Sequence, residues 1–363
     1  MTPPSAPIYT IPDLLTTWPW ARAKNPDLQV VQNDANAWVE SLNLFKPAQL
    51  KKFKACEFNL LASLVGPILG EGKPTSVDSG VELTDHHLDY LRISCDLMNF
   101  YFAFDEYTDV VSKEDAMKIC YNVMETMRTR TAVKEDIKIT EMARQFFERT
   151  INVVGDDRTG LHQFILDFEA YAISMIQEAD DRAEDRIRGV EEYLVLRRDT
   201  CGAKPSFSFF GLGLNLPAEV FEHPLMVSLT ERAADLVAMT NDMHSYSLER
   251  ARGLDGHNIL TCIMHEHSLG LQNALHWLDE YAINTIAKFQ AYQAKLPSFG
   301  SPEVDAAVVE YINRMARCVR GYDSWSYETV RYYGDRGLDV QKSRKITLMP
   351  KQTGYVTREE LAV

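Results

Sequence analysis

The chain has 363 residues, of which 45% are hydrophobic, and its formal net charge is −14 from 38 basic and 52 acidic residues. This length allows one large domain or two ordinary ones, each with a substantial core. The acidic balance argues against non-specific binding to nucleic acids or to anionic membranes, because both need clustered Lys and Arg.

No targeting or membrane segment is evident. The N-terminus lacks a basic region followed by an apolar run, so we expect no signal peptide, and residues 58–70 and 205–218 are apolar but too short to span a bilayer. The cysteines contain no C-x-x-C pair, which is typical of reduced thiols in a cytosolic protein; they are Cys56, Cys95, Cys120, Cys201, Cys262 and Cys318. We therefore expect a cytoplasmic protein without membrane insertion.

Apolar residues recur with helical spacing along almost the whole chain. Helices are predicted over residues 86–105, 112–127, 141–154, 161–176, 226–250, 269–294 and 303–332. Breaks at residues 70–80, 155–160, 201–205, 251–258 and 296–303 are spaced as helix connections. Strand-like alternation is hard to find. We predict one all-α domain over residues 1–335 and a C-terminal tail over 336–363 that is loop or partly ordered.

The first chemically informative stretch is LMNFYFAFDEYTDVV, residues 97–111. On a helix, Asp105 and Asp109 share a face with Met98, Tyr101 and Phe102, because steps of three, four and seven align. Two carboxylates beside an apolar surface repel each other and lose hydration, and the stretch holds no Lys or Arg to compensate them. A divalent cation would resolve this conflict, and carboxylate ligands suit Mg²⁺.

A second stripe lies in NDMHSYSLE, where Asn241, Ser245 and Glu249 follow one another at intervals of four. An amide oxygen, a hydroxyl and a carboxylate on one helix face can converge on one ion. Taken alone, either stripe could instead be a solvated helix face. The acids of residues 180–185, which lie among arginines without apolar neighbours, are interpreted in that way.

Together the two stripes resemble the class I terpene synthases, in which an aspartate-rich motif and an N-x-x-x-S-x-x-x-E motif bind three Mg²⁺ ions that hold a prenyl diphosphate. Arg198 resembles the diphosphate-sensing arginine of that family. Cys201 and Gly202 stand at the positions of its linker and effector residues in a helix break. The resemblance implies an all-α bundle around a central apolar cavity.

The C-terminal part of the resemblance rests on SWSYETVRYYG. Arg331 and Tyr332 are similar to an Arg-Tyr pair that hydrogen-bonds the diphosphate, and Trp325 resembles a cavity aromatic. Other residues expected at the cavity are Met98, Tyr101 and Phe102. Many fungal members carry Lys where this chain has Leu248, so a diphosphate contact is absent or supplied elsewhere, with Lys204 and Arg197 as candidates.

The lead-in and motif variants look most like fungal (basidiomycete) sesquiterpene synthases, and Leu248 resembles a subgroup that includes protoilludene synthases. This implies ionisation and cyclisation of farnesyl diphosphate with release of diphosphate, by a monomer or homodimer. One alternative is a chain-elongating prenyl diphosphate synthase, which needs a second aspartate-rich motif where this chain has Asn, Ser and Glu. Another is a non-catalytic helical scaffold with solvated acid stripes.

Overall fold

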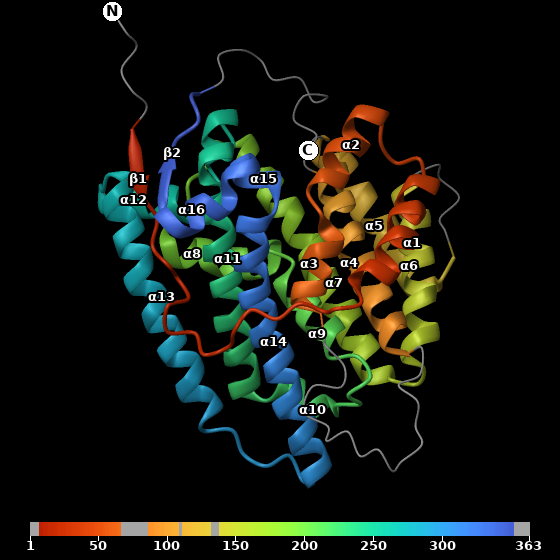
Figure 1. Cartoon of the computed structure of the whole chain (residues 1–363). Coiled ribbons are helices and arrows are strands. Elements are labelled where there is room, and N and C mark those ends of the chain that lie inside the picture. Colours follow the sequence, from red (N-terminus) through yellow and green to blue (C-terminus); the bar gives the residue numbers. More distant parts are fainter. Residues whose placement is uncertain (1–6, 67–85, 109–110, 132–137, 352–363) are drawn as a thin grey trace, which may run out of the picture.

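The computed structural model describes residues 7–66, 86–108, 111–131 and 138–351 (Figure 1). Its helices are α1 (Leu28–Ser41), α2 (Pro47–Ala55), α3 (Phe58–Val65), α4 (His86–Thr108), α5 (Lys113–Thr129), α6 (Lys138–Val154), α7 (Arg158–Ala183), α8 (Val190–Thr200), α9 (Ala203–Phe210), α10 (Ala218–Glu222), α11 (Pro224–Arg252), α12 (Ile259–His267), α13 (Leu271–Gln293), α14 (Pro302–Glu328), α15 (Val330–Tyr333) and α16 (Gly337–Ser343). A 3₁₀ turn covers Gly334–Arg336, and two short strands, β1 (Ile8–Thr10) and β2 (Lys345–Thr347), pair with each other.

The all-α prediction is confirmed, and each long predicted helix has a counterpart. The predicted helix 303–332 is interrupted at Thr329, where the backbone turns to an extended ψ of 154° before α15 begins. The predicted break at 70–80 lies outside the described residues. Within the described part of the chain, no helix is both long and apolar enough to cross a membrane.

Local chemistry explains where the helices begin. The Ser112 side chain accepts a hydrogen bond from the backbone N–H of Asp115, which confirms Ser112 as the N-cap of α5. Asp157 caps α7 in the same way by accepting from the N–H of Gly160. Since these caps satisfy backbone donors that the helix leaves free, they fix the first residue of each helix.

The long helices α11 and α14 pack against each other at the centre of the molecule (Figure 1). The helix α13 covers α11 on one side, while α3 packs on α14 and α4 packs on α3. The α3–α14 contact needs a glycine, because a Cβ on Gly321 would lie 2.2 Å from the carbonyl oxygen of Leu64. This arrangement places the two predicted ligand stripes, on α4 and α11, in one bundle.

The two ends of the described chain are joined. The strand β2 pairs antiparallel with β1, and the backbone N–H of Ile11 donates to the carbonyl of Arg344 at 2.8 Å. Arg344 also donates to the Asp13 carboxylate at 2.9 Å. The predicted tail thus contains the helix α16 and the strand β2 within its described part, residues 336–351. Three-residue strands carry too little periodicity to be read from sequence.

Candidate active site

A cavity of about 280 Å³ lies among α3, α4, α7, α8, α9, α11, α14 and α15. Apolar side chains, including Leu61, Val65 and Val237, line part of it. The other part gathers four carboxylates and four arginines from the described residues: Asp105, Glu106, Glu178, Glu249, Arg182, Arg197, Arg252 and Arg331. The cavity therefore has a charged end and an apolar end, which is typical of a site for an amphipathic ligand.

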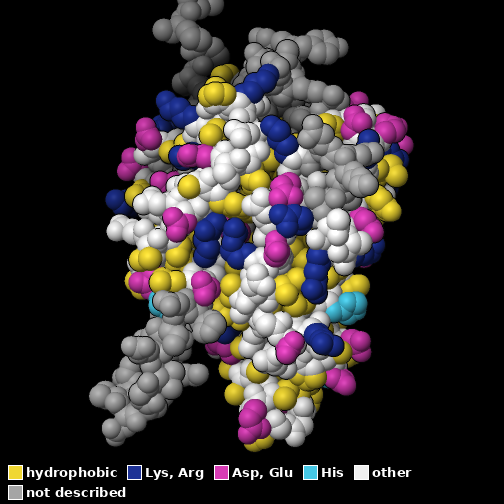
Figure 2. Space-filling model, turned by 90° about the vertical axis from the view of Figure 1, so that its right-hand side faces the viewer, with side chains coloured by type: hydrophobic (Ala, Val, Ile, Leu, Met, Phe, Trp, Pro, Cys, Tyr) yellow, Lys and Arg dark blue, Asp and Glu magenta, His cyan; other side chains and the backbone are white. Residues whose placement is uncertain are grey.

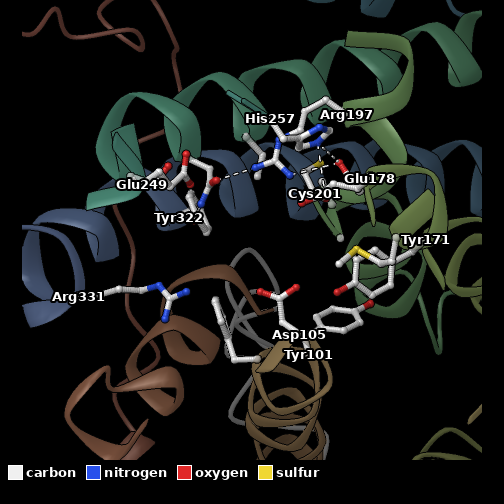
Figure 3. Close-up of a pocket in the computed structure, with 18 of the residues that line it drawn as sticks. Tyr101, Asp105, Tyr171, Glu178, Arg197, Cys201, Glu249, His257, Tyr322 and Arg331 are labelled. Carbon is white, nitrogen blue, oxygen red and sulfur yellow. Dashed lines mark hydrogen bonds and ion pairs between the residues drawn. The ribbon is translucent and has the colours of Figure 1, made fainter. Parts of the chain in front are cut away.

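Asp105 projects from the C-terminal part of α4 into this cavity, on the side opposite Glu249 (Figure 3). The pKa of its carboxyl is raised to about 6, mainly by burial and also by the nearby Glu178, while Arg331 partly opposes both. Met98, Tyr101 and Phe102 lie on the same face of α4 and line the cavity as well, so the helix directs Asp105 toward it. Asp109, the second acid of this motif, lies outside the described residues.

The second stripe lines the same cavity. Asn241, Ser245 and Glu249 all face it from α11, as their spacing of four predicts. The pKa of Glu249 is raised to about 7, mainly by burial and also by the buried Asp242. The Glu249 carboxylate accepts a hydrogen bond at 2.9 Å from the amide of Asn258, which holds it in place at the end of the helix.

The donor chemistry of these residues fits a divalent cation. The cavity presents carboxylate, amide and hydroxyl oxygens from two facing helices, and its carboxylates are held where burial disfavours their charge. Among the described residues, no group of three or more His, Cys, Asp or Glu side chains could hold a metal ion. Asn241 and Ser245 offer oxygen donors of other types at the same cavity, an amide and a hydroxyl.

A hydrogen-bonded triangle links α11 to the C-terminal helices. The amide nitrogen of Asn241 donates to the hydroxyls of both Tyr322 and Tyr332, and the two hydroxyls lie 3.0 Å apart. Arg331, the neighbour of Tyr332, enters the cavity with its guanidinium 5.2 Å from the ring centre of Phe102. The predicted Arg-Tyr pair is thus placed at the same cavity end as the two oxygen stripes.

Comparisons with known proteins agree with this arrangement. The family described as terpene synthase family 2, C-terminal metal binding, matches residues 96–288. The chain is 39% identical to the sesquiterpene synthase Agr9 of Cyclocybe aegerita, over 95% of this chain and 89% of that protein. It is 36% identical to a Δ6-protoilludene synthase of Stereum hirsutum, over 94% and 88%.

The chain belongs to the terpene synthase family.

Solved structures support the fold independently of sequence. A linalool/nerolidol synthase from Streptomyces clavuligerus superposes with a TM-score of 0.70 at 18% identity, covering 85% of this chain and 97% of that one. A hedycaryol synthase gives 0.68 at 19% identity, covering 87% and 100%. At such low identity these likenesses establish the terpene synthase fold alone.

The wall of the cavity in this terpene synthase includes aromatic side chains beside the aliphatic ones. Tyr101 lies parallel to Phe168, with ring centres 6.0 Å apart, and meets the edge of Tyr171 at 5.7 Å. Phe102 stacks on Phe58 at 3.9 Å. Met98, Tyr101 and Phe102 all line the cavity, as expected from their place on the same helix face as Asp105. Such rings present negative faces that attract cations.

The position of Trp325 differs from the prediction that it lines the cavity. It is fully buried but does not line the cavity, and its indole nitrogen donates to the carbonyl of Cys56 at 3.1 Å. Phe102 and Tyr332 lie 5.7 and 5.9 Å from its ring and stand between it and the cavity. Trp325 supports the cavity wall from behind because α14 turns that face toward α3.

Of the two adjacent arginines of α8, Arg198 differs from the prediction, whereas Arg197 lies at the cavity as one of the two candidates for the contact missing at Leu248. Arg198 is not a lining residue; its guanidinium donates to the fully buried carboxylate of Asp235 at 2.7 Å. Arg197 does line the cavity, where it donates to Asp242 at 2.9 Å and to the amide oxygen of Asn241 at 2.6 Å. Neighbouring helix positions point about 100° apart, and here Arg197 is directed toward the cavity while Arg198 is directed toward Asp235 on α11.

The helix break that was predicted at residues 201–205 is present between α8 and α9. Cys201 ends α8, and Gly202, with a φ of +66°, starts α9 in a left-handed conformation that glycine adopts without strain. Both residues line the cavity. Burial raises the pKa of the Cys201 thiol, so it stays protonated and unreactive at neutral pH.

Several residues that line the cavity were not identified from the sequence. Glu178 of α7 faces His257, whose Nε2 lies 3.6 Å from the carboxylate (Figure 3). Burial lowers the pKa of His257, and this effect exceeds the opposing attraction of Glu178, so the imidazole is neutral at pH 7. Arg182, which the sequence analysis assigned to a solvated helix end, lines the cavity and pairs with Glu178 at 2.7 Å. Nothing in their local spacing marks these residues, because only the packing of α7 and of the segment after α11 brings them to the cavity.

Proposed function

We propose that this chain is a sesquiterpene synthase, a lyase that ionises farnesyl diphosphate, cyclises the resulting cation and releases diphosphate. The observation that carries the proposal is the single cavity in which oxygen stripes of α4 and α11 and the pair Arg331–Tyr332 border an aromatic wall. The family and the sesquiterpene synthases among its relatives support the same substrate class.

The proposed cofactor is Mg²⁺, with three ions assigned by resemblance. Asp105 and Asp109 would hold metal from the α4 side, and Asn241, Ser245 and Glu249 from the α11 side. Bound metal neutralises the diphosphate so that it becomes a competent leaving group. Asn241 must first release its amide oxygen from Arg197, with which it is hydrogen-bonded in this structure.

The charged residues bind and orient the diphosphate. Arg331 supplies a positively charged guanidinium group at the cavity. The Tyr332 hydroxyl can donate a hydrogen bond to a phosphate oxygen. On α8, Arg197 is better placed than Arg198 to bind the diphosphate, because Arg197 lines the cavity. Arg198 could bind it only after its ion pair with Asp235 had broken. Charge that develops on the leaving oxygen is then stabilised by groups already in place.

The apolar end protects and steers the cation. When the C–O bond breaks, both electrons leave with the diphosphate, and an allylic carbocation remains that water would quench. Phe102 and Tyr101 offer ring faces that stabilise positive charge without acting as nucleophiles. The protonated thiols of Cys201 and Cys318, whose pKa values burial raises, also line this space. They are poor nucleophiles in that form.

Two alternatives have less support. A chain-elongating synthase would need a second aspartate-rich motif, and α11 carries Asn241, Ser245 and Glu249 instead. A scaffold with solvated acid stripes does not agree with Asp105 and Glu249 facing one cavity, where burial raises both pKa values. For the product we favour Δ6-protoilludene, since relatives from Stereum hirsutum and Armillaria gallica bear that name at 36% identity.

The test is incubation of the purified chain with farnesyl diphosphate and Mg²⁺, followed by gas chromatography with mass detection. We expect a volatile sesquiterpene, and its mass spectrum and retention decide whether it is Δ6-protoilludene. Chelation by EDTA should abolish the product. A second incubation that adds isopentenyl diphosphate separates the alternatives, because a longer prenyl diphosphate would indicate chain elongation. Recovery of unchanged substrate with Mg²⁺ present contradicts the proposal.

A further inference from the structure

The last turn of α11 places one more cation at the charged end of the cavity. Arg252 is half-buried and lines the cavity three residues after Glu249 and four after Leu248. Helical side chains tilt toward the N-terminus of their helix, so Arg252 reaches back over the turn that holds Leu248. Leu248 lines the cavity too, and its apolar side chain offers no charge there.

The four arginines of the cavity fall into two groups. Arg182 is paired with Glu178, and Arg197 is paired with Asp242. Within the described ranges, Arg252 and Arg331 form no ion pair with any carboxylate, although both line the cavity. The first two arginines must share their charge between a protein carboxylate and a ligand, whereas the other two have no carboxylate partner at ion-pair distance in the described part of the chain.

Arg252 and Arg331 also act on each other. Burial lowers the pKa of Arg252, and the proximity of Arg331 lowers it further, whereas Glu106 and Glu249 raise it. Two cations held near each other at a partly buried site raise the free energy of the unliganded protein. An anion that contacts both removes that repulsion, and a guanidinium presents a planar fork that matches two phosphate oxygens.

We propose that Arg252 binds the diphosphate group of the substrate together with Arg331, the two guanidinium groups contacting it from α11 and α15. The inference rests on the proposed function and adds a residue to that site. On ionisation the diphosphate takes both electrons of the broken C–O bond and keeps its contacts, so Arg252 remains protonated and exchanges no atom.

A purely structural role for Arg252 has a different consequence. As a basic residue in the last turn of a helix, it would stabilise α11 through the helix dipole and nothing else. Arg250 lies in the same last turn but does not line the cavity, so it shares the dipole effect without access to a ligand. R250Q is therefore the matched control for R252Q.

The experiment measures the affinity of the full chain for inorganic pyrophosphate in Mg²⁺ buffer by titration calorimetry, together with kcat/KM for farnesyl diphosphate. For R252Q we expect a Kd for pyrophosphate about 10- to 100-fold higher than in the unsubstituted protein, and a matching fall in kcat/KM. R250Q should stay within about twofold in both measurements. R252K keeps the charge but loses the fork, so its Kd should rise at least about threefold.

The outcomes separate the two proposals. If the unsubstituted chain neither binds pyrophosphate nor turns over farnesyl diphosphate, the proposed function is contradicted. If that chain is active and R252Q binds pyrophosphate as R250Q does, only the role of Arg252 is overturned. Should R252Q fail to fold, an R252K variant with unchanged Kd overturns it equally.

Discussion

The side-chain amide of Asn241 donates a hydrogen bond to the hydroxyl of Tyr332 across 3.2 Å, although 91 residues separate them in sequence. This contact ties the oxygen stripe of α11 to the Arg-Tyr pair of α15. Tyr322 completes the link by contacting both partners. A change at Asn241 should therefore affect diphosphate binding as well as metal binding.

We predict that Asn241→Ala and Asp105→Asn each lower kcat for farnesyl diphosphate by at least about 100-fold, because each removes an oxygen ligand. The far-UV circular dichroism spectrum without ligand should change little in both variants, but Asn241→Ala should lower the melting temperature because it removes the hydrogen bonds to Tyr322, Tyr332 and Arg197. Asn273→Ala, at an exposed position on α13, is the control and should be silent. Near-normal rates in both variants would contradict the metal assignment.

The adjacent arginines of α8 give a second prediction. Arg197→Lys should raise the Kd for pyrophosphate about tenfold, because lysine cannot reproduce the bidentate fork. Arg198→Lys should instead lower the free energy of unfolding by about 1–3 kcal/mol, because it weakens the contact to the buried Asp235. Calorimetry with pyrophosphate and urea unfolding separate the two effects. If Arg198→Lys loses pyrophosphate affinity and Arg197→Lys does not, the family assignment of Arg198 is correct.

A third prediction concerns pH. Burial raises the pKa of Asp167 to about 6, and its hydrogen bonds from Ser208 and Gln163 oppose that rise. An ordinary carboxyl in the unfolded chain has a pKa of about 3.9. The folded state therefore binds more protons between about pH 4 and 6, and this group lowers stability as the pH rises through that window.

Asp167→Asn removes this titration. The free energy of unfolding of the variant relative to the unsubstituted chain should rise by about 1–2 kcal/mol between pH 4.5 and pH 7.5, a value reduced because Asp167 is only partly buried. Urea unfolding of both proteins at the two pH values measures it, and all other titrating groups cancel in the difference. A difference that does not depend on pH would show that the carboxyl titrates normally in the folded protein.

The fourth prediction separates Trp325 from the cavity. Trp325→Phe should lower the free energy of unfolding by about 1–3 kcal/mol, from the lost volume and the lost hydrogen bond to Cys56. The Cys56 carbonyl still accepts from the Thr329 hydroxyl, so no acceptor is orphaned. The Kd for pyrophosphate should not change.

Phe102→Leu, at the cavity surface, should instead change the product distribution. An unchanged product profile in this variant would argue against contact between Phe102 and the cation.

Much of the site was predictable because its ligands obey helix periodicity. Asn241, Ser245 and Glu249 are spaced by four, and the same rule relates Asp105 to Tyr101. Because each stripe lies on a helix, this spacing places its residues on one shared face. Arg182 and His257 could not be found in this way, because their neighbours in sequence do not distinguish a side chain facing a cavity from one facing solvent.

The sequence by itself determined the helical class, the family resemblance and the shared helix faces of the two oxygen-bearing motifs, because periodicity and motif spacing are local properties of a chain. Only the tertiary structure decided that Arg197 reaches the cavity while Arg198 pairs with Asp235, and that Trp325 lies behind the wall. It also decided that the tail pairs with the N-terminal strand. The direction of each such side chain depends on which distant helix packs against it, and single-chain spacing carries no record of that contact.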